Sequence, residues 1–92
     1  MISKTAKGTI GELIVMVQYI KKGFYVARSA DPQSPFDLVV VDKNGKCRLI
    51  DVKSISIRKT GAKKGTKINR HLNARQRKMK VRIEYVDTTT IV

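Results

Sequence analysis

The chain has few of the residues from which disulfides, zinc sites and membrane spans are built. It contains one cysteine, Cys47, one histidine, His71, and no tryptophan. A single cysteine excludes a disulfide within the chain and fits a reducing compartment, and the sequence lacks the spacing of a zinc site. It also lacks a signal peptide and an apolar run long enough to span a bilayer. We therefore expect a cytoplasmic protein with no membrane partner and no organic cofactor.

Acidic residues are scarce too, and this scarcity indicates a partner. The 92 residues include 20 Lys+Arg but only 7 Asp+Glu, a net charge of +13. The excess lies mostly in the second half, where no acid occurs between Lys53 and Ile83. Such a charge favours nucleic acid as the partner. A chain of this length forms one small domain with a modest core, so a homodimer or higher homo-oligomer would add stability.

Hydrophobic spacing predicts the element order α-β-β-β-α-β, a small mixed α/β domain. Ser3 or Thr9 opens a first helix and Gly23 closes it. Its apolar stripe consists of Ile10, Leu13, Ile14, Val17 and Ile20. Other apolar residues cover most of the remaining circumference, so we expect burial on two sides, by the sheet and by a second subunit. Strands are expected over 24–27, 36–42, 46–57 and 81–86, a short helix capped by Asn73 over 74–80, and an edge strand over 88–92.

A basic loop, residues 58–72, is expected between the third strand and the short helix. Its length and its glycines favour a segment that is mobile until it binds DNA. The side chains expected to contact phosphates are Arg58, Lys59, Lys63, Lys64, Lys67, Arg70, Arg75 and Lys78. Phosphate contacts fix position rather than sequence, so we expect selection by the shape of the DNA.

The turn at 43–45 decides which residues face each other across the second and third strands. A two-residue Asn-Gly loop pairs Asp37 with Val52, whereas a three-residue loop with a left-handed glycine pairs Asp37 with Asp51. We predict the three-residue loop. Two acids opposite each other are destabilising unless a cation lies between them. Lys53 shares their face by alternation.

These residues suit the hydrolysis of a phosphodiester bond. Mg²⁺ takes oxygen ligands from one or two carboxylates, neutralises phosphate charge and activates water. Asp37 and Asp51 would supply the carboxylates and Val52 a backbone carbonyl, with Mn²⁺ as a possible substitute metal. Lys53 would orient the attacking water or stabilise the developing negative charge. The alternative is a surface Asp51–Lys53 ion pair beside a turn-forming Asp37.

Glu12, Pro35-Phe36-Asp37 and Ile50-Asp51-Val52-Lys53, in this order, resemble the PD-(D/E)XK nuclease superfamily. The stretches 7–13, 22–26 and 36–40 are similar to intron-encoded and phage PD-(D/E)XK endonucleases, and more distantly to archaeal-type Holliday junction resolvases. The resemblance implies a single minimal nuclease domain over residues 1–92, with a restriction-endonuclease-like core whose N-terminal helix packs on a mixed sheet. A phage or mobile-element origin would fit it.

The resemblance also implies roles for individual residues. Asp37 and Asp51 would be metal ligands, Lys53 the catalytic lysine, Glu12 an additional acid at the metal, and Gln76 a group that positions water or phosphate. The chain departs from the pattern in the extra residue before Asp37 and in its short length.

Glu12 has a second interpretation, as the partner of Thr9 in a helix capping box. It could still approach the metal if the first helix packs through its Val15/Met16 side. The residue pattern alone leaves both roles open.

Three functions are compatible with these features. The first is a Mg²⁺-dependent DNA endonuclease that selects branched, nicked or single-stranded DNA by structure. The second is a basic protein that binds DNA or RNA without catalysis. The third is a small subunit of a phage or ribonucleoprotein assembly.

Overall fold

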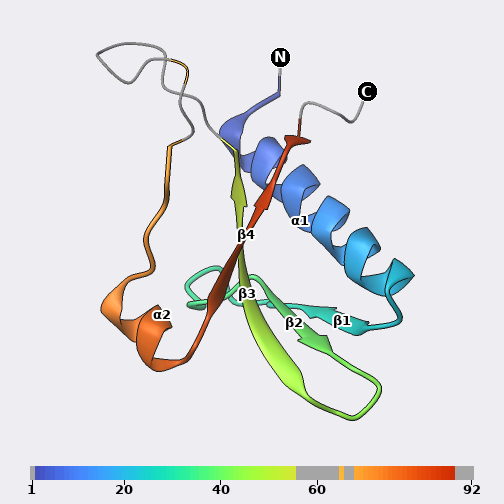
Figure 1. The fold of residues 1–92 in the computed structure, drawn as a ribbon. Helices are drawn as coiled ribbons and strands as arrows, with labels where there is room; N and C mark the ends of the chain where they lie inside the picture. Colours follow the sequence, from blue (N-terminus) through green and yellow to red (C-terminus); the bar gives the residue numbers. More distant parts are fainter. Residues whose placement is uncertain (1, 56–64, 66–67, 89–92) are drawn as a thin grey trace.

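The computed structural model describes residues 2–55, 65 and 68–88, and in it one long helix packs on a four-stranded mixed sheet (Figure 1). The elements are α1 (Lys4–Lys21), β1 (Tyr25–Arg28), β2 (Leu38–Val41), β3 (Cys47–Ser54), α2 (Ala74–Lys78) and β4 (Arg82–Val86). The predicted element order and the α/β class are confirmed. Figure 1 shows α1 along one side of the sheet and α2 on the other side of β3 and β4.

The first helix begins at Ser3, whose hydroxyl accepts a hydrogen bond of 3.1 Å from the backbone N–H of Ala6. Thr9 lies inside the helix and donates its hydroxyl proton to the Thr5 carbonyl at 3.2 Å. The expected alternative of a capping box between Thr9 and Glu12 is therefore wrong. The helix ends at Lys21 with Lys22 as its C-cap, and Gly23 follows with a φ of 90°, the left-handed conformation that glycine adopts without strain.

The sheet has the order β1-β2-β3-β4. The first three strands form an antiparallel meander, and β4 returns to pair with β3 in parallel, which places Val52 beside Glu84. A parallel pair needs a long crossover connection, which here is the segment that contains α2. The crossover brings α2 close to β3, although many residues separate them in the sequence.

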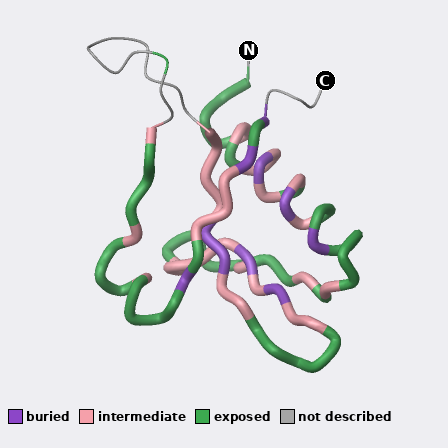
Figure 2. Tube along the Cα trace, viewed as in Figure 1, coloured by how far each residue is buried: buried purple, intermediate pink, exposed green. Residues whose placement is uncertain are grey.

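The core lies between α1 and one face of the sheet. Figure 2 shows buried positions recurring along α1 and along β2 and β3. The cluster consists of Val15, Tyr19, Leu38, Val40, Ile50 and Val86. At Gly11 the helix lies so close to β4 that a Cβ would come within 3.0 Å of a Val86 methyl group. The helix therefore packs through its Gly11/Val15/Tyr19 side.

Most of the apolar stripe of α1 faces away from the sheet, although Ile14 packs against the core. Leu13, Val17 and Ile20 are 48%, 51% and 58% exposed. The expectation that one side of the helix meets the sheet is thus confirmed for the Val15 side, and Leu13, Val17 and Ile20 lie on the side that the sheet leaves uncovered.

Some element boundaries differ from those expected. The strand expected to reach Ile57 is β3, which ends at Ser54, and residues 56 and 57 lie outside the described residues. The short helix ends at Lys78 rather than Lys80, because Lys80 has a φ of 60° and cannot continue a helix. Of the expected edge strand only Thr88 is described, and it lies in a short 3₁₀ turn. None of the helices in the described residues is long and apolar enough to cross a membrane.

Most of the expected basic loop lies outside the described residues, which include only 65 and 68–72 of it. The phosphate contacts expected from Arg58, Lys59, Lys63, Lys64 and Lys67 are therefore not placed, and its expected mobility stays a prediction.

Candidate active site

The hairpin between β2 and β3 has the predicted three-residue loop. Asp42 donates its N–H to the carbonyl of Lys46 at 3.0 Å, and Gly45 has a φ of 84°. Leu38 then pairs with Ile50. The same register places Asp37 and Asp51 side by side, one position beyond this pair.

Asp37 lies just before β2, where the regular backbone hydrogen bonds between β2 and β3 end. Its side chain takes the place of the missing backbone acceptor. Its backbone N–H bonds to the carbonyl of Ile50 at 2.8 Å, and its Oδ2 accepts the N–H of Val52 at 2.7 Å. The N–H and C=O of one strand residue lie on the same edge of that strand. The carbonyl of Val52 therefore faces the Asp37 side as well, as required of the expected third oxygen ligand.

Asp51 and Lys53 point to the sheet face opposite α1, because the alternating Ile50 lies in the core. Asp51 is only 7% exposed. Its Oδ2 lies 3.6 Å from the ammonium of Lys53 and accepts a hydrogen bond of 3.2 Å from the Gln76 side-chain amide. A buried carboxylate needs such partners, because an unpaired charge away from water is costly.

Gln76 is held in place by the start of α2. Its Oε1 accepts the N–H of Asn73 at 3.0 Å, and the Asn73 side chain accepts the N–H of Gln76 at 2.8 Å, forming a capping box. Because Oε1 is used in this way, the amide NH₂ must point outward, and it bonds both Asp51 and the carbonyl of Pro35, the latter at 2.9 Å. The structure therefore brings Gln76 to the acid pair.

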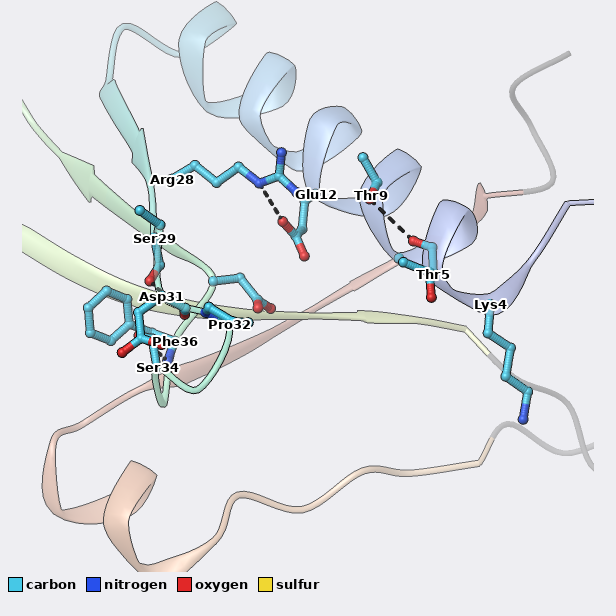
Figure 3. A pocket seen from close by; sticks show the side chains of 13 residues that line it. Lys4, Thr5, Thr9, Glu12, Arg28, Ser29, Asp31, Pro32, Ser34 and Phe36 are labelled. Atoms are coloured by element: carbon cyan, nitrogen blue, oxygen red, sulfur yellow. Dashed lines mark hydrogen bonds and ion pairs between the residues drawn. The ribbon is translucent and has the colours of Figure 1, made fainter.

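Glu12 lies on the α1 side of the site. Its carboxylate bonds Arg28 at the end of β1, with Oε1 2.9 Å from Nε. Both residues line a cleft of about 680 Å³ that also reaches Asp37, Asp31 and Lys4 (Figure 3). The sequence analysis did not predict the ion pair between Glu12 and Arg28. Strand alternation could have indicated it, because Arg28 lies two residues after Val26 and faces α1 as Val26 does.

The electrostatics of the site disfavour two negative charges without a cation. The pKa of Asp37 is raised from 3.8 to about 6, first by burial, then by its hydrogen bond to Asp51 and by the charges of Asp51 and Glu12. The N–H of Val52 acts in the opposite direction. A divalent cation between the carboxylates would remove this penalty.

The donor set fits Mg²⁺, which prefers oxygen and needs only one or two carboxylates because it retains waters. It consists of two carboxylates and the carbonyl of Val52. Within the part of the chain that the structure describes, no three histidine, cysteine or acidic side chains come together closely enough to hold an ion. A direct bond from Glu12 to the metal therefore stays a prediction.

The described basic residues of the predicted DNA contacts lie on the α2 side of the sheet. Arg75 and Lys78 are exposed on α2. Arg70 lies before α2, where its backbone N–H bonds the hydroxyl of Tyr85 at 2.7 Å. Their contact with DNA stays a prediction.

The chain matches no protein-family model and no curated protein. Its fold is similar to a solved structure of a bacterial homing endonuclease, I-Ssp6803I, with a TM-score of 0.58 and 26% sequence identity. The similarity covers 71% of this chain but only 41% of that chain. The fold is therefore nuclease-like, and this chain spans less than half the length of the structure that it matches.

Proposed function

We propose that the protein is a metal-dependent DNA endonuclease of the PD-(D/E)XK type, and that residues 1–92 form one minimal nuclease domain. One observation carries the proposal: Asp37 and Asp51 meet across the hairpin, with Lys53 3.6 Å from the second carboxylate. The likeness to a homing endonuclease and the net charge of +13 support it.

The carboxylates of Asp37 and Asp51 and the carbonyl of Val52 would hold Mg²⁺, or Mn²⁺ in its place. The bound metal supplies phosphate neutralisation and an acidified water. Lys53 would orient the attacking water or stabilise the developing negative charge. Gln76 fixes the orientation of Asp51, and Glu12, held by Arg28, adds negative charge at the edge of the site.

The substrate is DNA selected by its structure, with branched, nicked and single-stranded forms as the candidates. The support is the kind of side chain available, because lysine and arginine contacts to phosphate position a strand without reading bases. Holliday-junction-like DNA is the form to test first, on the resemblance to resolvases.

A second copy of the chain covers the exposed stripe of α1 in this proposal. Four residues of the stripe line an apolar groove of about 430 Å³, and Lys21, at its end, is the one charged residue that the described part of the chain contributes to this groove. A two-fold pair through this groove would bury Leu13 and Val17 and give an assembly with two active sites. Because two copies of charge +13 repel each other, the dimer should strengthen with salt. Sedimentation of wild type and Val17→Glu tests this, and a wild-type monomer at all salt concentrations contradicts it.

The function is tested by incubating plasmid and four-way junction DNA with the protein in Mg²⁺ and in EDTA. Wild type should cut only with metal, and Asp51→Asn and Lys53→Ala should not cut. Lys46→Ala at the hairpin is the matched control and should cut as wild type does. If all four proteins give the same products, the endonuclease assignment is wrong.

The second candidate is a protein that binds DNA or RNA without cutting it, and the net charge of +13 favours it. Asp37→Asn separates the two candidates. Nucleic-acid binding should persist or improve in both cases, since a negative charge is removed. Only the endonuclease has a metal-dependent cleavage to lose.

A further inference from the structure

A second cleft, of about 390 Å³, adjoins the acid pair and is cationic. Its charged lining comes from three separate segments: α1, the end of β3, and the chain before α2. The residues that matter here are Lys4, Lys7, Gly8, Lys53, Ser54 and Arg70. Every ionisable side chain that the described residues contribute to this cleft is basic, unlike the first cleft, which Glu12 and Asp37 line.

The cationic cleft is continuous with the candidate active site. Lys53 lines it and also lies 3.6 Å from Asp51. Lys4 and Gly8 line both clefts. A ligand at the acid pair would therefore extend along the first turns of α1 without leaving the lined surface.

No contact among the described residues explains a glycine at position 8. It is exposed in the second turn of α1, a helical position where glycine is less favourable than alanine. A Cβ there would meet nothing within 4 Å, whereas a Cβ on Gly11 would meet Val86 at 3.0 Å. Packing against Val86 thus disfavours a side chain at position 11, whereas no described neighbour disfavours one at position 8. A close approach of a ligand to the helix backbone would explain glycine there.

We propose that this cationic cleft binds the phosphate that neighbours the one to be cut, with the strand lying directly against Gly8. The identity of the bond that is cut rests on the proposed function, whereas the binding of phosphate by the cleft does not. Lysine ammonium groups act as point charges for phosphate, arginine adds a planar fork, and the Ser54 hydroxyl can donate to an oxygen. The cleft would fix the direction in which a DNA strand enters the site.

The test compares two double variants that remove the same charge. Lys4→Gln/Lys7→Gln changes the cleft, and Lys43→Gln/Lys46→Gln changes the exposed hairpin at the opposite end of the molecule (Figure 1). Binding of labelled single-stranded and duplex oligonucleotides is measured in EDTA over a range of salt concentrations. The cleft variant should bind at least tenfold more weakly, and its slope of log affinity against log salt should fall by about one or more. The hairpin variant should stay within about threefold of wild type.

Equal losses in both double variants would overturn the proposal, because charge alone would then explain binding. If wild type fails to cut DNA but the cleft variant still loses binding selectively, the endonuclease function fails and the phosphate site stands. If wild type cuts DNA and the two double variants bind it alike, the phosphate site fails and the endonuclease function stands.

Gly8→Ala gives an independent test that a general loss of stability cannot imitate. The variant should melt at a higher temperature than wild type, because alanine favours the helix, and yet bind DNA at least fivefold more weakly. A stabilised variant with unchanged DNA affinity would overturn the contact at Gly8.

Discussion

Asp37→Asn should stabilise the metal-free protein, although it removes a residue proposed for catalysis. The asparagine Oδ1 can still accept the N–H of Val52, a bond of 2.7 Å in the structure. What the substitution removes is the negative charge that faces Asp51. General charge effects act in the opposite direction, since the change raises a net charge that is already +13. A gain in stability would therefore be specific to the acid pair.

The magnitude follows from the pKa of Asp37, which rises from 3.8 to about 6. This rise corresponds to an upper limit of about 3 kcal/mol. Because Asp37 is only half-buried, solvent screening reduces the effect, and about 1 kcal/mol is expected. For a domain of this size that is a melting temperature about 4–8 °C higher for the variant in EDTA at pH 8.

The sign of the pH dependence is fixed by the same shift. Between pH 3.8 and about 6 the folded wild type binds more protons at Asp37 than the unfolded chain does. The wild type therefore loses stability as the pH rises through this window, and the loss is complete above it. Asp37→Asn lacks this slope, so the gap between the two proteins should be small near pH 4 and largest above pH 7.

Thermal melts of both proteins from pH 4 to pH 8, in EDTA and in Mg²⁺, measure these effects. Mg²⁺ should stabilise wild type alone, since it binds only that folded state. Asp31→Asn removes the same charge from an exposed loop and serves as the control for net charge. The reasoning is refuted if Asp37→Asn melts at or below wild type in EDTA at pH 8, or if the gap does not change with pH.

Three further substitutions test other parts of the site and fold. Lys53→Ala should lower Mg²⁺-dependent plasmid cleavage by about a hundredfold or more while DNA binding changes only a few-fold; equal losses in both would contradict a catalytic role. Gln76→Ala should lower the free energy of unfolding in urea by about 1–2 kcal/mol. Asn73→Ala should lower it by less, because that change removes the cap but leaves the Gln76 amide beside the buried Asp51. Gly11→Ala should cost about 1–3 kcal/mol by the same measurement, because its Cβ lies 3.0 Å from Val86, and a neutral result would mean that the helix shifts freely.

The sequence predicted the acid pair because a local feature determines it. A turn of a given length fixes the register of a hairpin, so Gly45 and its neighbours were enough to place Asp37 opposite Asp51. One half of the capping box of α2 was predicted in the same way, because Asn73 was expected to cap the helix. The return bond from Gln76 was not predicted. Both features depend on residues that are close together in the chain.

Contacts between distant elements were not predictable in this way. The apolar residues of α1 fall on both of its sides, so periodicity did not show that Val15 and Tyr19 face the sheet while Leu13 and Val17 do not. The pairing of Glu12 with Arg28 depends on that choice. Thr9 preceded Glu12 by the spacing of a capping box, but Ser3 started the helix earlier and left Thr9 inside it.

The backbone around Asp37 explains how the two neighbouring acids are held in position. Where β2 departs from the ladder, the N–H of Val52 would be left without a strand partner, and the Asp37 carboxylate accepts it at 2.7 Å. Asp51 is held on its other side by Gln76 and Lys53. Each acid is thus positioned by a contact that a bound metal would not need to break, since every carboxylate has further lone pairs. The remaining repulsion, seen in the raised pKa of Asp37, is what a divalent cation would relieve, so metal affinity and metal-free instability should rise and fall together among variants of this pair.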